Sequence, residues 1–218
     1  MNASSYECVD YGAPESFFVF VVGNCEEWPD NREEQGDIAL YNEYLASGVP
    51  PDQVLFLQDK RANYANCNKQ LSNFLQRTRP HSTLVFSYGG HGKPTGFCTL
   101  KRLWPYREVL HMIENLFQGE RVLFLLDCCA SGNIASWLCL LYPATTKQYV
   151  MLASSPPFVI TTDEGEEWIL NHRWMLGMRC NDGNLALHQV IECLSDRTAL
   201  ILGDQFTVFM SDGVDDTK

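Results

Sequence analysis

The chain has 218 residues, of which 45% are hydrophobic and 20% are charged. This length and composition predict one globular domain over residues 1–218, with flexible ends at 1–15 and 212–218. The formal net charge of −11 argues against nucleic acid as the main partner, because phosphate binding needs a basic protein face.

The nine cysteines are irregularly spaced and include no CxxC pair, so the sequence predicts no zinc ribbon. The first residues lack the charged-then-apolar pattern of a secretory signal. No apolar run approaches the ~20 residues that a membrane helix needs. These features predict a cytoplasmic protein with no membrane partner.

Strand and helix patterns alternate along the chain. Short apolar runs predict strands at 17–23, 54–59, 83–88, 121–127 and 149–155, and an edge strand at 205–210. Helical spacing predicts helices at 37–48, 66–78, 105–119, 133–142 and 183–194. In the first helix, Asp37 is expected to cap the start, and Ile38, Tyr41 and Leu45 to share a face. The alternation predicts an α/β three-layer sandwich, with a mainly parallel sheet of about six strands and helices on both faces.

Two strand ends carry the candidate chemistry, because ligands of such sheets bind beyond the carboxyl ends of the strands. "GGHG" (89–92) places glycines around His91, and "DCCASG" (127–132) places two thiols at a strand tip. Strand alternation points Asp127 and Cys129 one way and Cys128 into the packing. If the two strands are neighbours, Cys129 and His91 form a thiol nucleophile with an imidazole proton carrier.

The stretches "LVFSYGGHG" and "VLFLLDCCASG" resemble the motifs of caspase-like cysteine peptidases, the clan of caspases, metacaspases and legumains. The likeness is closest to metacaspases and their bacterial caspase-like relatives. It implies a caspase-like fold and an endopeptidase that works through an acyl-enzyme. Cys129 would be the nucleophile and His91 the general base and acid, with the backbone N–H groups of Gly92 and Cys129 as the oxyanion hole.

The resemblance also implies that Asp127, and less directly Asp37, bind an arginine or lysine before the cleaved bond, by attraction between opposite charges. The partner is then a protein or peptide substrate, with a regulatory or recruiting protein as a further candidate. No cofactor or bound metal is implied. Some metacaspases need Ca²⁺ as an activator, and the acidic run 161–168 is a candidate site, although it lacks EF-hand spacing and reads better as a solvated loop.

Two departures from the metacaspase pattern leave an alternative open. Gly89 stands where metacaspases usually have serine, and Ala130 stands where they usually have histidine. An inactive caspase-like scaffold or regulatory subunit, acting by protein binding, fits these changes. A nucleotide-binding α/β protein is a weaker alternative, because the chain lacks both GxGxxG after the first strand and GxxxxGK[ST].

Overall fold

The computed structural model describes residues 13–24, 36–155, 199–201 and 208–210. The predicted helix 183–194, the acidic run 161–168 and most of both predicted flexible ends lie outside these residues. The strands are β1 (Phe17–Asn24), β2 (Val54–Gln58), β3 (Thr83–Gly90), β4 (Gly92–Lys93), β5 (Gly96–Thr99), β6 (Arg102–Pro105), β7 (Arg121–Asp127), β8 (Gln148–Ala153), β9 (Ala199–Ile201) and β10 (Val208–Met210). The α-helices are α1 (Gly36–Ala46), α2 (Tyr64–Leu75), α3 (Tyr106–Leu116) and α4 (Asn133–Leu141).

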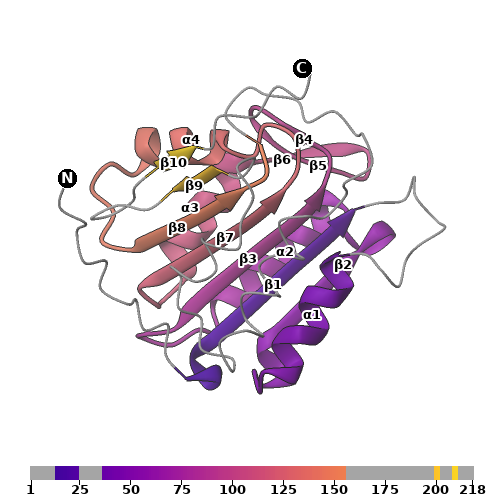
Figure 1. The fold of residues 1–218 in the computed structure, drawn as a ribbon, viewed down its shortest axis with the longest axis vertical. Coiled ribbons are helices and arrows are strands. Elements are labelled where there is room, and N and C mark those ends of the chain that lie inside the picture. The colour runs from indigo at the N-terminus through magenta and orange to yellow at the C-terminus, as the bar shows by residue number, and fades with distance from the viewer. Residues whose placement is uncertain (1–12, 25–35, 156–198, 202–207, 211–218) are drawn as a thin grey trace, which may run out of the picture.

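The main sheet has the strand order β10-β9-β8-β7-β3-β1-β2 (Figure 1). The strands from β8 to β2 pair in parallel, whereas β9 pairs antiparallel with both β8 and β10. The prediction of a mainly parallel α/β sheet is therefore confirmed. This sheet has seven described strands rather than about six, because a short antiparallel pair extends the β8 edge. Strand β10 falls inside the predicted edge strand 205–210, and β9 was not predicted.

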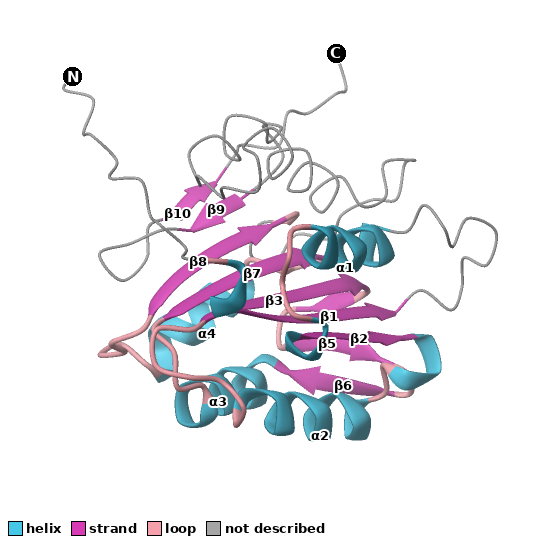
Figure 2. Ribbon diagram, turned by 90° about the horizontal axis from the view of Figure 1, so that it is seen from below, coloured by secondary structure: helices cyan, strands magenta, loops and turns pink. Residues whose placement is uncertain are grey.

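Helices cover both faces of the sheet, as the alternating pattern predicts. Alternate strand residues divide into two buried clusters, one shared with α2, α3 and α4 and the other shared with α1. Figure 2 shows α1 on one side of the sheet and the other three helices on the opposite side. The residues Phe20, Phe86 and Phe124, on three neighbouring strands, lie in the first cluster, and Val21 and Leu125 lie in the second.

Helix α1 differs from its prediction in which face it buries. Asp37 lies in the first turn of a helix that begins at Gly36, and it is buried together with Leu40 and Tyr44. The predicted face, Ile38, Tyr41 and Leu45, is only half-buried. Apolar residues surround most of this helix, so the spacing does not select one face. Contact with the sheet decides it, and Tyr41 instead stacks on Phe56 of β2, with ring centroids 5.6 Å apart.

The chain forms a second, three-stranded antiparallel sheet, β4-β5-β6, between β3 and α3 in the sequence. This sheet was not predicted. Its strands have two to four residues each, which is too few for an alternating pattern to be recognised in the sequence. The sheet lies beyond the carboxyl end of β3 (Figure 1). It therefore stands beside the edge where the candidate site was expected.

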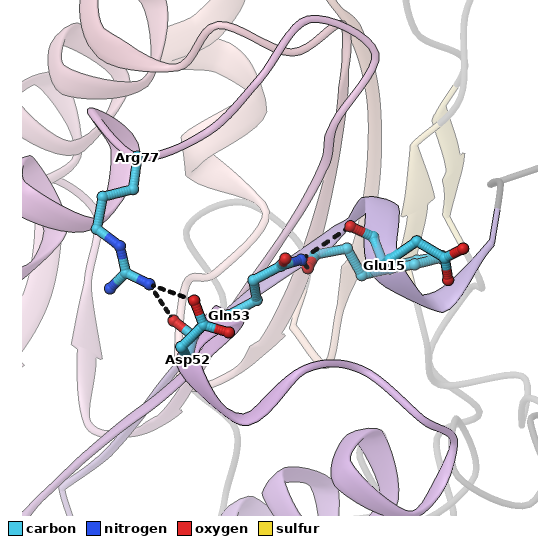
Figure 3. A network of polar contacts seen from close by, with 5 residues as sticks. Glu15, Asp52, Gln53 and Arg77 are labelled. Atoms are coloured by element: carbon cyan, nitrogen blue, oxygen red, sulfur yellow. Dashed lines mark hydrogen bonds and ion pairs between the residues drawn. The ribbon is translucent and has the colours of Figure 1, made fainter.

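At the opposite edge, polar contacts join the starts of β1 and β2 (Figure 3). The buried Gln53 side chain donates to the backbone oxygens of Glu15 (2.9 Å) and Phe17 (2.7 Å). Nearby, Arg77 bonds the carbonyl of Asp52 and lies 3.4 Å from its carboxylate. These contacts fix the amino-terminal edge of the sheet and leave the carboxyl edge to the candidate site.

Candidate active site

The two motif strands are neighbours. Strands β3 and β7 pair in parallel from Thr83 opposite Arg121 to Gly89 opposite Asp127. His91 and Cys129 each lie two residues beyond this pair. The carboxyl ends of β3 and β7, which they follow, lie at the same edge of the sheet (Figure 1). The structure thus brings the two predicted residues to one edge, where open α/β sheets bind their ligands.

The two motifs are also in direct contact. A Cβ atom added to Gly92 would overlap the carbonyl oxygen of Cys129 and would lie 2.9 Å from Sγ of Cys128. The strand after His91 therefore packs directly on the turn that holds both thiols, and only glycine permits this approach. The contact joins Gly92 and Cys129, the two residues whose N–H groups are the predicted oxyanion hole.

Backbone hydrogen bonds hold His91 in place. Its carbonyl oxygen accepts from the backbone N–H of Cys98 (2.9 Å) and from the hydroxyl of Tyr88 (3.0 Å). The carbonyl of Cys98 in turn accepts from Tyr88 (2.7 Å) and from the side-chain amide of Asn24 (2.6 Å). The imidazole belongs to an exposed residue on a well-anchored backbone. Tyr88, Asn24 and Cys98 were not predicted, because nothing in their local sequence shows these partners.

The two adjacent thiols lie in different environments. Cys128 is 4% exposed and belongs to the larger buried cluster, on the face of α3 and α4. Burial raises the pKa of the Cys128 thiol well above its ordinary value, and the charge of Asp127 raises it further. Cys129 is half-buried at the tip of the turn. Cys128 is therefore a neutral packing residue, and Cys129 is the thiol with solvent access.

The turn after Cys129 is fixed by Ser155, which follows β8. Ala130 has a left-handed backbone (φ +54°), and its N–H donates to the Ser155 hydroxyl (3.2 Å). The N–H of Gly132 donates to the Ser155 carbonyl (2.9 Å), and Ser131 bonds the same residue. A third strand end therefore supports the turn that carries the thiols. Sequence reasoning missed Ser155 because its partners lie more than 20 residues away in the chain.

The two predicted acids lie on the α1 side of the same edge. In the rows of paired residues, Gly23, Gly89 and Asp127 are in register on β1, β3 and β7. Residues two positions earlier on these strands include Val21 and Leu125 of the α1-side cluster, so Asp127 points toward that face. Asp37 lies over Gly23, where an added Cβ would be 2.5 Å from the Asp37 carboxylate. Gly89 lies between the two acids and carries no side chain.

Asp37 is 1% exposed, which is unusual for a carboxylate. Burial raises the pKa of the Asp37 carboxyl well above its ordinary value, and the negative charges of Asp127 and Asp59 raise it further. Two strand spacings of ~4.8 Å separate β1 from β7, so the backbones of Gly23 and Asp127 lie on the order of 10 Å apart. An arrangement of this kind favours a bound cation, which would relieve the repulsion between the carboxylates.

Other features of the surface are separate from this edge. A hollow of about 510 Å³ lies between α2, α3 and the end of α4, and it includes none of the predicted site residues. Within the described part of the chain, no cluster of histidine, cysteine or acidic residues could hold a metal ion. No helix among the described residues has the length and apolar character needed to cross a bilayer.

Comparison with models of known protein families gives no match, and comparison with curated protein sequences gives none either. The residues and their geometry therefore carry the functional argument.

Proposed function

We propose that the protein is a cysteine endopeptidase of caspase-like fold that cleaves peptide bonds after arginine or lysine. One observation carries the proposal: β3 and β7 are neighbouring parallel strands whose ends, bearing His91 and Cys129, meet at the contact between Gly92 and the Cys129 carbonyl. A strand order that separated the two motifs would have excluded a shared site.

In the proposed mechanism, the sulfur of Cys129 attacks the scissile carbonyl while His91 accepts the thiol proton. The N–H groups of Gly92 and Cys129 stabilise the oxyanion of the tetrahedral intermediate. His91 then protonates the leaving amine, and the acyl group stays on Cys129 as a thioester. Water, deprotonated by His91, hydrolyses this thioester and restores the thiol.

The acids on the α1 side supply the proposed preference for a basic residue. Asp37 lies over Gly23 and Asp127 is in register with Gly89, so a guanidinium or ammonium group bound between them would be close to both carboxylates. Burial, and then repulsion by Asp127 and Asp59, raises the pKa of the Asp37 carboxyl, and a cation bound beside it would favour the ionised form of both acids. The substrate would therefore be a protein or peptide with an exposed basic residue.

A cytoplasmic location, activation by calcium and a regulatory partner belong to the same proposal. The cytoplasmic location is proposed from the sequence, and the five cysteines among the described residues form no disulfide. Calcium remains a proposed activator only, since the acidic run 161–168 lies outside the described residues. A regulatory or recruiting partner remains a proposal of the same kind.

The test is hydrolysis of fluorogenic peptides that end in arginine, lysine, aspartate or leucine. The wild-type chain is expected to cleave the arginine and lysine peptides selectively, and Cys129→Ala is expected to lose at least ~10³-fold in kcat/KM. Cys128→Ala is the matched control, because it removes the neighbouring thiol and should keep most of the activity.

Equal turnover by wild type and Cys129→Ala would reject the assignment. An electrophilic arginine-peptide probe separates the remaining alternative. An active peptidase is labelled at Cys129, whereas the inactive scaffold suggested by Gly89 and Ala130 should bind proteins without labelling. Preferential cleavage after aspartate would overturn the proposed role of Asp37 and Asp127.

A further inference from the structure

A buried serine lies on the same face of the sheet as the two candidate acids. Ser87 is on β3, two residues before Gly89, so the two positions face the same side of the strand. In the paired rows, Ser87 is in register with Val21 of β1 and Leu125 of β7. Both neighbours belong to the cluster shared with α1, so the Ser87 side chain projects toward the α1 side.

The acids lie one row nearer the carboxyl edge than Ser87. Gly23, Gly89 and Asp127 form that row, and Asp37 lies over Gly23, where an added Cβ would be 2.5 Å from the Asp37 carboxylate. Two residues along a strand span about 7 Å, which is the distance between the two rows. The two glycines place no side chain of the sheet between the acids and Ser87.

The Ser87 hydroxyl is buried and unsatisfied. The residue is 0% exposed, and its Oγ has no hydrogen-bond partner among the described residues. Other buried serines do have partners: the Ser82 hydroxyl accepts from the N–H of Arg79 (3.0 Å), and Ser131 bonds Ser155. A buried hydroxyl without a partner destabilises a fold. Its presence beside two acids therefore points to a partner that arrives with a ligand.

We propose that Ser87 makes the candidate site prefer arginine over lysine, its hydroxyl accepting a hydrogen bond from the guanidinium of a bound arginine. This inference rests on the proposed function, because it concerns the pocket for the basic residue. A guanidinium carries five N–H donors in a planar fork. Two bidentate pairs with Asp37 and Asp127 use four of them, and the fifth needs another acceptor. The Ser87 oxygen supplies that acceptor in the row below the acids.

A lysine side chain makes less use of this hydroxyl. Its ammonium group has three donors and sits on a shorter stem, so the two carboxylates hold it one row above Ser87. Asp37 and Ser87 are both closed to solvent, so a cation that reaches Asp37 enters a space where water cannot replace the serine. One hydrogen bond between a charged donor and a buried acceptor changes affinity about tenfold or more.

The experiment compares two fluorogenic peptides that differ only in ending with arginine or lysine. In Ser87→Ala, the ratio of the two kcat/KM values is expected to fall about tenfold toward lysine, through a loss on the arginine peptide alone. The melting temperature should equal or exceed that of wild type, because no hydrogen bond among the described residues is removed. Ser82→Ala is the matched control: it loses the bond to Arg79, so it should melt lower and keep the wild-type ratio.

An unchanged ratio in Ser87→Ala would overturn the inference, and so would a lower melting temperature, which would give the hydroxyl a structural role. Binding separates this inference from the proposed function, since calorimetry with the same peptides on Cys129→Ala needs no turnover. Tighter binding of the arginine peptide to Cys129→Ala, lost in Cys129→Ala/Ser87→Ala, supports the role of Ser87 even if the wild-type chain hydrolyses neither peptide. Equal affinities of these two chains for the arginine peptide reject that role, whatever the wild-type chain hydrolyses.

Discussion

Cys128 and Cys129 are adjacent in the chain, but Cys128 lies in the core and Cys129 is accessible to solvent. Alternation along β7 sends Leu126 and Cys128 into the larger cluster, and Leu125 and Asp127 to the α1 side. The buried Cys128 packs under Gly92, and burial raises its pKa well above the ordinary value. The chemical difference between the two cysteines therefore comes from strand geometry, since the residues themselves are identical.

Asp37 carries a cost of burial that a substitution can reveal. Its pKa is raised in the folded chain, by burial first and then by the charges of Asp127 and Asp59. The folded state therefore holds the Asp37 proton more tightly than the unfolded state does. Stability falls as pH rises from the ordinary aspartate pKa through the raised one, and below the ordinary value Asp37 is protonated in both states and makes no difference.

Asp37→Asn should consequently stabilise the chain at pH 7, by ~1 kcal/mol in the free energy of unfolding, which is the energy of about one unit of pKa shift. This gain should shrink toward zero as pH is lowered toward the ordinary aspartate pKa, as measured by urea unfolding across the series. The same variant should lose preference for arginine peptides. Asp52→Asn, an acid with a side chain 78% exposed, is the control and should shift stability by less than ~0.5 kcal/mol. An Asp37→Asn chain that is less stable at pH 7 contradicts the argument.

At the scale of elements, the small sheet β4-β5-β6 holds the backbone of His91 in place. The histidine leaves β3 and enters β4 within two residues, and β5 holds its carbonyl through Cys98. Tyr88 and Asn24 then fasten the Cys98 carbonyl to β3 and β1. The main sheet therefore sets which residues meet at its edge, and the hairpin fixes the backbone of His91.

Because Gly92 packs on the Cys129 turn, Gly92→Ala tests whether activity depends on the position of β4 and His91. The added methyl group overlaps the Cys129 carbonyl, so β4 must move away from the turn and carry His91 with it. A displacement on the order of 1 Å costs about 100-fold in kcat/KM, and overpacking costs ~1–3 kcal/mol of stability. The loss of kcat/KM is measured by peptide hydrolysis, with the active enzyme counted by probe labelling of Cys129. The loss of stability is measured by thermal unfolding.

Gly119→Ala is the matched control for this prediction. A Cβ at Gly119 overlaps a backbone oxygen in the same way, that of Ser82, but at the amino-terminal ends of β3 and β7. It should lower stability by a similar amount and leave kcat/KM of the folded fraction within a few-fold of wild type. Equal losses of activity in both variants would show that Gly92 matters for folding and has no special place at the site.

For the whole molecule, the sequence predicts the parts of the fold that rest on strong local patterns. The apolar runs around Phe20, Phe86 and Phe124 are long enough to predict the central strands, and their alternation with helices predicts parallel order and helices on both faces. The meeting of the two motifs at one edge follows from that order. These features need no knowledge of any particular contact.

The remaining features depend on contacts between distant segments. The burial of Asp37 arises because Gly23 leaves space beneath it, and charge alone would have placed that residue at the surface. In the sequence, nothing distinguishes Ser155 from Ser154, because both simply follow a strand. Its contact with the turn after Cys129 is seen only in the folded chain. The short strands β4 to β6 have no periodic pattern to detect. The supports of the site are therefore less predictable than its candidate reactive residues.

The net charge of the whole chain gives a last prediction. A formal charge of −11 attracts cationic substrates over a distance set by salt, about 30 Å at 0.01 M and about 10 Å at 0.1 M ionic strength. The kcat/KM for an arginine peptide should therefore fall about tenfold between these concentrations, because steering of the encounter and attraction to Asp37 and Asp127 both weaken. Hydrolysis rates at low substrate concentration measure this directly in a KCl series.

Alkylation of Cys129 by neutral iodoacetamide provides the internal control, since an uncharged reagent feels no long-range field. Its rate should vary by less than twofold over the same series, in parallel with an unchanged melting temperature. If the arginine peptide and iodoacetamide respond equally to salt, the effect lies in the thiol or the fold, and the acidic surface has no part in selecting the substrate. If only the kcat/KM of the arginine peptide falls with salt, the negative charge of the chain contributes, together with Asp37 and Asp127, to the preference for a basic substrate.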